Sequence, residues 1–150
     1  MLTVLGAVGL AGAVALPLVA FVIVPALVRS TLVEDLPPVT GPPIETVSQG
    51  ELIRINAADY GSGIVRIVKV GEDHVLRFQG VDIAGAPDMY VYLSDRVDGR
   101  PGAFVDLGKL KATSGSFNYP IPASVDLATV RSVVVWCRQF SVTVTYATLG

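Results

Sequence analysis

Cysteine, histidine and tryptophan are nearly absent from this chain. Its 150 residues include one Cys, one Trp and one His. A single cysteine, Cys137, excludes an intramolecular disulfide, so the fold must be stabilised by its hydrophobic core. A single histidine, His74, excludes a histidine-rich copper or zinc site within one chain, and the paired-cysteine haem attachment motif is missing. We therefore expect no metal site.

Basic clusters and hydrolase motifs are lacking as well. The formal net charge is -2, and no basic cluster is present to neutralise phosphates, which argues against a nucleic-acid partner. Gly61-Ser62-Gly63 lacks the spacing of a nucleophile elbow. Asp95 and Asp98 do not match a calcium loop, and we interpret them as solvated turn residues. These absences argue against a stand-alone enzyme.

The N-terminal segment, residues 1–28, contains no charged side chain. At about 1.5 Å per residue, roughly 20 residues cross the hydrocarbon core of a bilayer, so this segment is long enough to span it. No Lys or Arg precedes Arg29, and the Val-Pro-Ala-Leu-Val exit is a poor cleavage site. We predict that residues 1–29 form an uncleaved transmembrane anchor that contacts lipid through residues 1–28. A cleaved signal peptide and a mis-assigned start codon are the alternatives.

Residues 30–48 carry two Pro-Pro pairs and a glycine. Prolines at this density favour extended, semi-rigid backbone, so we predict a linker that lifts the following domain off the membrane. A motif for a proline-binding partner is the alternative. Arg29, with Glu34 and Asp35 close behind, gives the positive-inside rule little to count. Because long domains translocate largely regardless of flanking charge, we expect a single-pass protein of the cell membrane whose residues 49–150 lie outside the cytoplasm.

Residues 49–150 have an all-β pattern. About eight short β-branched or aromatic runs recur at 8 to 12 residue spacing, separated by Gly, Pro and Asp turns, and no long helical period occurs after Val28. This predicts an antiparallel β-sandwich or a small barrel, of which we favour the sandwich. Asn118–Pro122 is predicted as an edge strand because its prolines cannot donate backbone hydrogen bonds. Asp126–Thr129 is predicted as a helical turn.

The C-terminal stretch has the clearest strand pattern. Val133 to Trp136 is a continuous β-branched and aromatic run, typical of a strand covered on both faces. Strict alternation follows and predicts one buried face. The apolar residues of that face are Phe140, Val142, Val144 and Tyr146. The region forms either the last two strands or one long strand bent near Arg138 and Gln139.

Cys137 lies where these two patterns meet, and it is the remaining candidate for chemistry. A cysteine among valines is often a small buried apolar side chain. Alternatively it is a reactive thiol, which Arg138 would favour as thiolate if both groups share a solvent-facing bend. Trp136 is interpreted in the same two ways, as a core anchor or as an electron relay.

The region from about Gly50 to Leu149 resembles the DM-thirteen domain family, which is regarded as an electron-transfer module. Ordered blocks carry the resemblance: Pro87-Asp88-Met89-Tyr90-Val91-Tyr92-Leu93-Ser94, Val105-Asp106-Leu107-Gly108-Lys109-Leu110-Lys111, Tyr119-Pro120-Ile121-Pro122, and Val133-Val134-Val135-Trp136-Cys137 with Phe140-Ser141-Val142. The resemblance implies a compact β-sandwich whose cysteine acts in redox chemistry, as a bare thiol or as a ligand to an unidentified group such as haem. It places Cys137 at the centre. The supporting residues would be Trp136, Arg138, Phe140, Asp88 and Tyr90.

Two departures from the family pattern bear on the site. Many members have a histidine shortly before the Ser-Gly turn, where this chain has Asp59-Tyr60, which weakens the case for a Cys/His ligand pair. The usual Asn-Gly-Pro-Asp becomes Gly85-Ala86-Pro87-Asp88, which alters the loop before the Met89 strand.

Two functional hypotheses follow. The first is a membrane-anchored extracytoplasmic domain with an electron-transfer or thiol-redox role centred on Cys137 and a redox protein as partner. The second is a non-catalytic cell-surface binding or structural module with a packing cysteine, whose loops at 82–88 and 94–102 meet a partner. A fully buried Cys137 would count against the first hypothesis.

Overall fold

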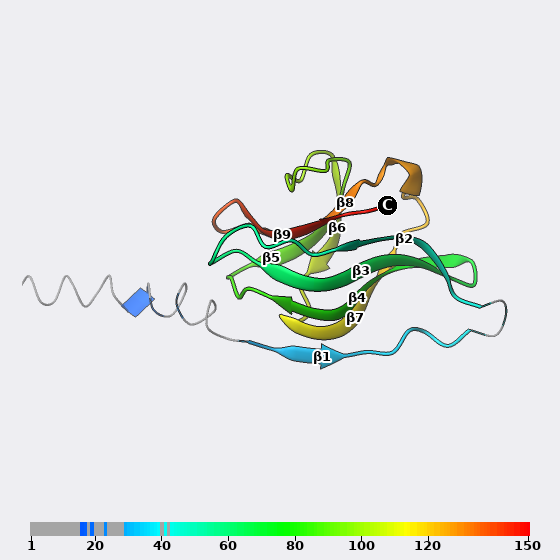
Figure 1. Cartoon of the computed structure of the whole chain (residues 1–150), viewed down its shortest axis with the longest axis horizontal. Coiled ribbons are helices and arrows are strands. Elements are labelled where there is room, and N and C mark those ends of the chain that lie inside the picture. The colour runs from blue at the N-terminus through cyan, green and yellow to red at the C-terminus, as the bar shows by residue number, and fades with distance from the viewer. Residues whose placement is uncertain (1–15, 18, 20–22, 24–28, 40, 42) are drawn as a thin grey trace, which may run out of the picture.

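The computed structural model describes residues 16, 17, 19, 23, 29–39, 41 and 43–150, and most of these form a two-sheet β-sandwich (Figure 1). The first sheet has the strand order β1-β7-β4-β3-β2 and the second β6-β5-β8-β9. The strand bounds are β1 Thr31–Val33, β2 Glu45–Glu51, β3 Gly61–Val70, β4 Asp73–Ile83, β5 Met89–Ser94, β6 Phe104–Lys109, β7 Ser114–Ile121, β8 Ser132–Cys137 and β9 Val142–Thr148, with a 3-10 turn, η2, at Leu127–Thr129 between β7 and β8.

The predicted all-β fold is confirmed for the described residues. All strand pairs are antiparallel except one, since β1 runs parallel to β7. The transmembrane helix predicted over residues 1–29 falls almost entirely outside the described residues. Among those that are described, no helix has the length and apolar character needed to cross a membrane.

The proline-rich segment joins the sandwich instead of standing apart from it. Ser30 N donates to Thr113 Oγ1 at 2.9 Å, and β1 then pairs with the start of β7. Leu36 and Val39 pack on a small apolar cluster formed by Val68, Val70 and Val75. Val68 and Val70 lie on the face of β3 opposite Ile67, which belongs to the main core. Residues 30–39 of the predicted linker therefore cover apolar side chains on the outside of the first sheet.

Glu34 fixes this segment electrostatically. Asn118 N donates to its Oε2 at 2.8 Å, and Lys111 Nζ lies 3.1 Å from its Oε1. The hydrogen bond from Asn118, followed by that from Lys111, lowers the pKa of Glu34 from its usual value. A carboxylate whose pKa is lowered in the folded state stabilises that state above its unfolded pKa. This stabilisation is lost as the pH falls through the folded pKa.

Substitution Glu34→Gln is expected to lower the free energy of unfolding by about 1 kcal/mol at neutral pH, because the exposed ion pair and a charge-assisted hydrogen bond are both lost. The loss should shrink at acid pH, as the pH falls through the lowered pKa of the folded state and the wild-type carboxylate is protonated too. Urea denaturation at both pH values measures this. Glu72→Gln, in the exposed β3–β4 turn, is the matched control. A loss of equal size at both pH values would contradict the assignment.

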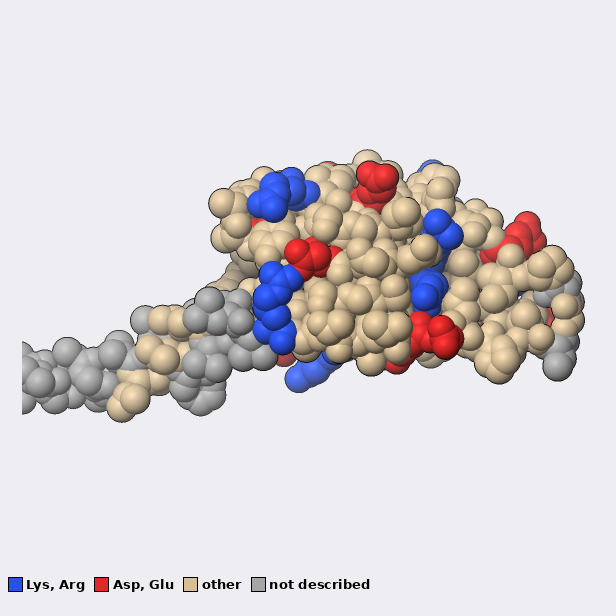
Figure 2. All heavy atoms as spheres, turned by 60° about the horizontal axis from the view of Figure 1, so that its bottom comes forward, with Lys and Arg blue, Asp and Glu red and all other residues tan. Residues whose placement is uncertain are grey.

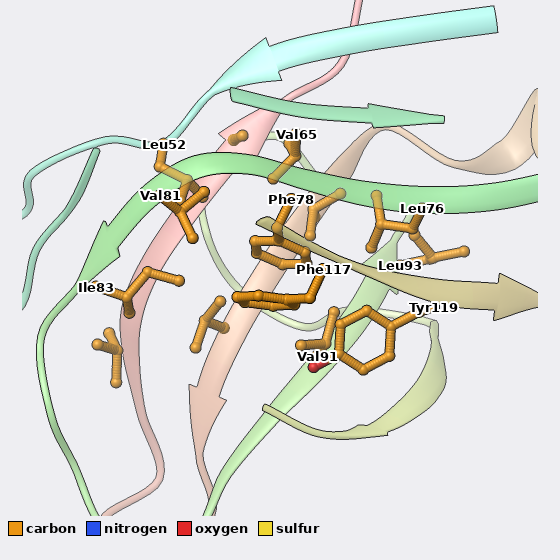
Figure 3. Close-up of a cluster of buried hydrophobic side chains, with 14 of the residues drawn as sticks. Leu52, Val65, Leu76, Phe78, Val81, Ile83, Val91, Leu93, Phe117 and Tyr119 are labelled. Atoms are coloured by element: carbon orange, nitrogen blue, oxygen red, sulfur yellow. The ribbon is translucent and has the colours of Figure 1, made fainter. Parts of the chain in front are cut away.

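An aromatic cluster fills the space between the two sheets (Figure 3). The rings of Phe78 on β4 and Phe117 on β7 stack with centroids 5.0 Å apart, and Tyr119 meets both rings edge-on. Phe78 and Phe117 have no exposed surface. The second sheet faces them with buried aliphatic side chains, among them Val91 and Leu93. Burial of these rings supplies much of the driving force that holds the sheets together.

The C-terminal stretch forms two strands, β8 and β9, joined by a turn at residues 138–141, which decides between the two alternatives left open above. Full burial of Val133 to Val135 is confirmed. The predicted buried face of β9 is wrong in part. Trp136 pairs with Thr143 but Val135 pairs with Thr145, so one extra residue bulges between them. The fully buried side chains are Val144, Thr145 and Ala147, whereas Tyr146 is half-buried and Val142 and Phe140 are exposed. A bulge shifts the side-chain alternation by one residue, which the pattern alone does not reveal.

The predicted edge strand at residues 118–122 needs a similar correction. It is the end of β7, which lies inside the sheet between β1 and β4. However, β1 pairs only with Ser114 to Ser116, so Pro120 lies beyond that pairing and need not donate to a neighbouring strand there. The predicted helical turn is confirmed as η2, whose N-cap Asp126 accepts a hydrogen bond from Ala128 N.

Candidate functional site

Cys137 is the last residue of β8, and its thiol points into the core. It pairs with Met89 on β5 and Val142 on β9, and its exposed fraction is 0%. The Sγ donates a hydrogen bond to the carbonyl oxygen of Pro87 at 2.9 Å. The solvent-facing bend considered for this residue is therefore not present: the bend begins at Arg138, one position later.

The β4–β5 loop and the β8–β9 turn meet around the thiol. The β4–β5 loop, residues 84–88, supplies Pro87 above it, and Arg138 N donates to Asp88 O at 3.1 Å, which joins this loop to the β8–β9 turn. Asp88 has φ 54° and Ser141 has φ 53°. Non-glycine residues in this left-handed region cost about 1–3 kcal/mol each, although Asp tolerates it better than most. The thiol thus lies beneath a closed and locally strained cover.

Arg138 lies beside the aromatic residues of the second sheet. Its guanidinium is 3.4 Å from the ring centroid of Tyr90, its Nε donates to Tyr92 Oη at 2.7 Å, and its Nη2 pairs with Asp106 at 2.5 Å. The hydrogen bond with Tyr92, and then that with Asp106, raises the pKa of Arg138. The positive charge of Arg138 therefore contacts Tyr90, Tyr92 and Asp106. The Cys137 thiol is instead hydrogen-bonded to the carbonyl oxygen of Pro87.

The structure gathers the residues that the sequence singled out at one end of the second sheet. Tyr90 and Trp136 are cross-strand neighbours on β5 and β8. Asp88 and Phe140 lie in the two connections at this end. Cys137 follows Trp136 directly, and since successive side chains of a strand point to opposite faces, the thiol enters the core while the indole faces outward.

A groove of about 560 Å³ opens beside Trp136. Three segments distant in sequence line it: residues 53–59, 98–100 and 141–146, together with Trp136 itself. Cys137 is not among the lining residues. Sequence reasoning did not find this groove, because no segment contributes more than two apolar side chains and residues 98–100 contribute none. Exposed isoleucines at 53 and 55 were the only local signal.

Three further residues at the site were missed as functional candidates. Pro87 provides the acceptor for the thiol, and Tyr92 and Asp106 bind Arg138. All three lie in the sequence blocks that resemble the DM-thirteen family. Their contacts, however, are made with residues on other strands, which a local sequence pattern does not predict.

The residues around Cys137 do not fit a haem bound through its sulfur. A thiolate ligand must face a space large enough for the group, whereas this Sγ is fully buried and bonded to Pro87. His74 cannot complete a Cys/His pair either. It lies near the start of β4, an 11-residue strand whose far end leads to the Pro87 loop, so at about 3.3 Å per residue the two ends are roughly 30 Å apart.

The fold and this site together define a two-sheet β-sandwich with one buried thiol at the end of a central strand. A family model described as "Electron transfer DM13" matches residues 55–149, and the chain belongs to this family. No curated protein and no solved structure matches the chain with significance. Strands β1 and β2 precede the matched residues, although both are part of the first sheet.

Proposed function

We propose that this chain is a membrane-anchored electron-transfer domain. In this proposal residues 1–29 hold it in the cell membrane as a single pass, residues 30–150 lie outside the cytoplasm, and a redox protein is the partner. The membership of the electron-transfer family carries the proposal, with the uncharged N-terminal segment as support for the anchor. The proposed redox group is the Cys137 thiol, the only one in the chain.

The burial of the Cys137 thiol limits how it can take part in electron transfer. Electron exchange by covalent thiol chemistry needs the sulfur exposed, and here Pro87 covers it. Opening of the 84–88 loop would expose the Sγ, and release of the left-handed conformation at Asp88 would favour that opening. In the closed state the thiol is protected from oxidation by solvent.

A second candidate function is favoured by the burial of Cys137. A cysteine with no exposed surface, packed within the main core cluster, is what a non-catalytic binding or structural module would have. In that case the groove beside Trp136 and the loops at 82–88 and 94–102 would contact the partner, and Cys137 would contribute packing only.

Voltammetry of the purified full-length chain in lipid nanodiscs distinguishes the two candidates. If Cys137 is the redox group, the wild type gives a faradaic signal that Cys137→Ala and Cys137→Ser both lose while their circular dichroism spectra remain unchanged. Two variants are needed because serine places a hydroxyl in the core and alanine leaves a small cavity. A signal that persists in both folded variants rules out the thiol and leaves the second candidate.

A further inference from the structure

The chain enters the sandwich at the end that carries the groove and the thiol. Arg29 pairs with Asp82 and donates to Tyr60 Oη at 3.2 Å, and Ser30 is hydrogen-bonded to Thr113. The guanidinium of Arg54 in turn lies over the ring of Tyr60, 4.7 Å from the ring centroid. Arg54 also lines the groove. Figure 1 shows the start of β1 at the same end of the molecule as the β8–β9 turn.

No spacer separates this end from the uncharged segment. Val28 is the last residue of that segment. The next residue, Arg29, already forms an ion pair with the sandwich, and Ser30 is hydrogen-bonded to it. From there residues 31–39, part of the segment that the proline content favoured as a spacer, run along the first sheet. If residues 1–28 cross a membrane, the end of the sandwich at Arg29 therefore lies at the membrane surface.

Apolar side chains are exposed at this end. Ile55 is 44% exposed and Phe140 48% exposed, and they come from connections far apart in the sequence. Ile53 and Val142, also exposed, line the groove with Ile55. Such a cluster on a water-facing surface marks a contact with a partner or a lipid surface.

The charges around the cluster suit a lipid interface. Of the two carboxylates that line the groove, Asp98 is paired with Arg96 at 2.5 Å, and Asp59 accepts from Asn56 Nδ2 at 2.9 Å. The two arginines that line it are exposed, although Arg54 lies over Tyr60 and the Arg100 Nε lies 3.9 Å from Asp98. Long aliphatic stems allow arginine to extend its charged end toward headgroup phosphates. On the face seen in Figure 2, acidic and basic side chains are interspersed. Since the net charge is -2 and the sequence has no basic cluster, apolar contact must provide most of the attraction to lipid.

We infer that the groove end of the sandwich, with Ile53, Ile55, Phe140 and Val142, rests on the surface of the lipid bilayer. The inference rests on the membrane anchoring proposed above. It places Trp136, which lines the groove, at the level of the lipid headgroups, where indole rings are favoured.

The single tryptophan makes this testable in the full-length chain. The chain is reconstituted in nanodiscs of phosphatidylcholine with and without a nitroxide on the lipid headgroup, and Trp136 fluorescence is compared. We expect the nitroxide lipid to lower the emission roughly twofold. The double variant Ile55→Ser, Phe140→Ser should lose most of this quenching. Val47→Ser, at an equally exposed valine of β2, is the matched control and should keep it.

The outcomes separate the two proposals. A chain that fails to float with lipid vesicles in a density gradient contradicts the anchoring itself. A chain that floats without quenching of Trp136 keeps the anchoring and overturns the surface contact. Quenching that the double variant retains in full shows that these apolar side chains do not hold the contact, and it overturns the inference as well.

Discussion

Replacement of Phe78 by alanine is expected to lower the free energy of unfolding by about 3–5 kcal/mol, since it removes a fully buried ring and leaves a cavity. Phe78 stacks on Phe117 and meets Tyr119 edge-on, so its loss disturbs the whole aromatic cluster between the sheets. Urea denaturation followed by Trp136 fluorescence measures the effect. Trp136 lies in the opposite sheet, so its signal reports whether the two sheets unfold together.

Phe104→Ala is the matched control for this change. Phe104 stacks on Tyr92 with centroids 4.1 Å apart but lies on the surface of β6, 47% exposed. Its loss should therefore cost about 1 kcal/mol. Because a domain of this size is stable by only about 5–15 kcal/mol, Phe78→Leu serves as a milder variant if the alanine variant does not fold. Equal losses from Phe78→Ala and Phe104→Ala would contradict the assignment of the core.

Substitution Gly115→Ala is expected to detach β1 and to lower the free energy of unfolding by about 2–3 kcal/mol. Gly115 has φ 108°, a conformation that side chains rarely adopt, and an added Cβ would collide with the carbonyl oxygen of Leu32 on β1. Amide exchange at Glu34, whose N–H donates to Ser116 O at 2.7 Å, should become fast in this variant.

Gly108→Ala separates strain from collision. Gly108 has φ 103°, but nothing lies within 4 Å of an added Cβ. It should therefore show the conformational cost alone and leave exchange at Glu34 unchanged. If β1 positions the groove end at the membrane, Gly115→Ala should also weaken the quenching of Trp136 by headgroup nitroxide, and Gly108→Ala should not. Slow exchange at Glu34 in the Gly115→Ala variant would show that β1 docking tolerates the side chain.

Local patterns predicted most of the β-strands correctly. The run from Val133 to Val135 is fully buried as expected, and Gly71-Glu72 makes one of the glycine-containing turns expected between short strands, here between β3 and β4. These features depend on residues adjacent in sequence: β-branched side chains favour a covered strand, and glycine permits the left-handed turn. The family resemblance likewise depends on short ordered blocks, and the family match over residues 55–149 confirms it.

Long-range packing produced the features that were predicted incorrectly or missed. The bulge in β9 arises from its pairing with β8, and it reverses which side chains face the core. Composition predicted a semi-rigid spacer over residues 30–48, because prolines at this density form no core of their own. Residues 30–39 instead lie against the first sheet, because Glu34 and Leu36 find partners on strands that lie far along the chain.

The sequence established that this is an all-β domain with one thiol, preceded by an uncharged segment long enough to span a bilayer, because composition and side-chain alternation are local properties. The tertiary structure decided that the Cys137 thiol faces inward under Pro87 and that Trp136 lines a groove. It also placed Arg29 at the same end of the sandwich as that groove. Each of these depends on the pairing of strands separated by dozens of residues, and the free energy of that pairing comes from burial in a shared core.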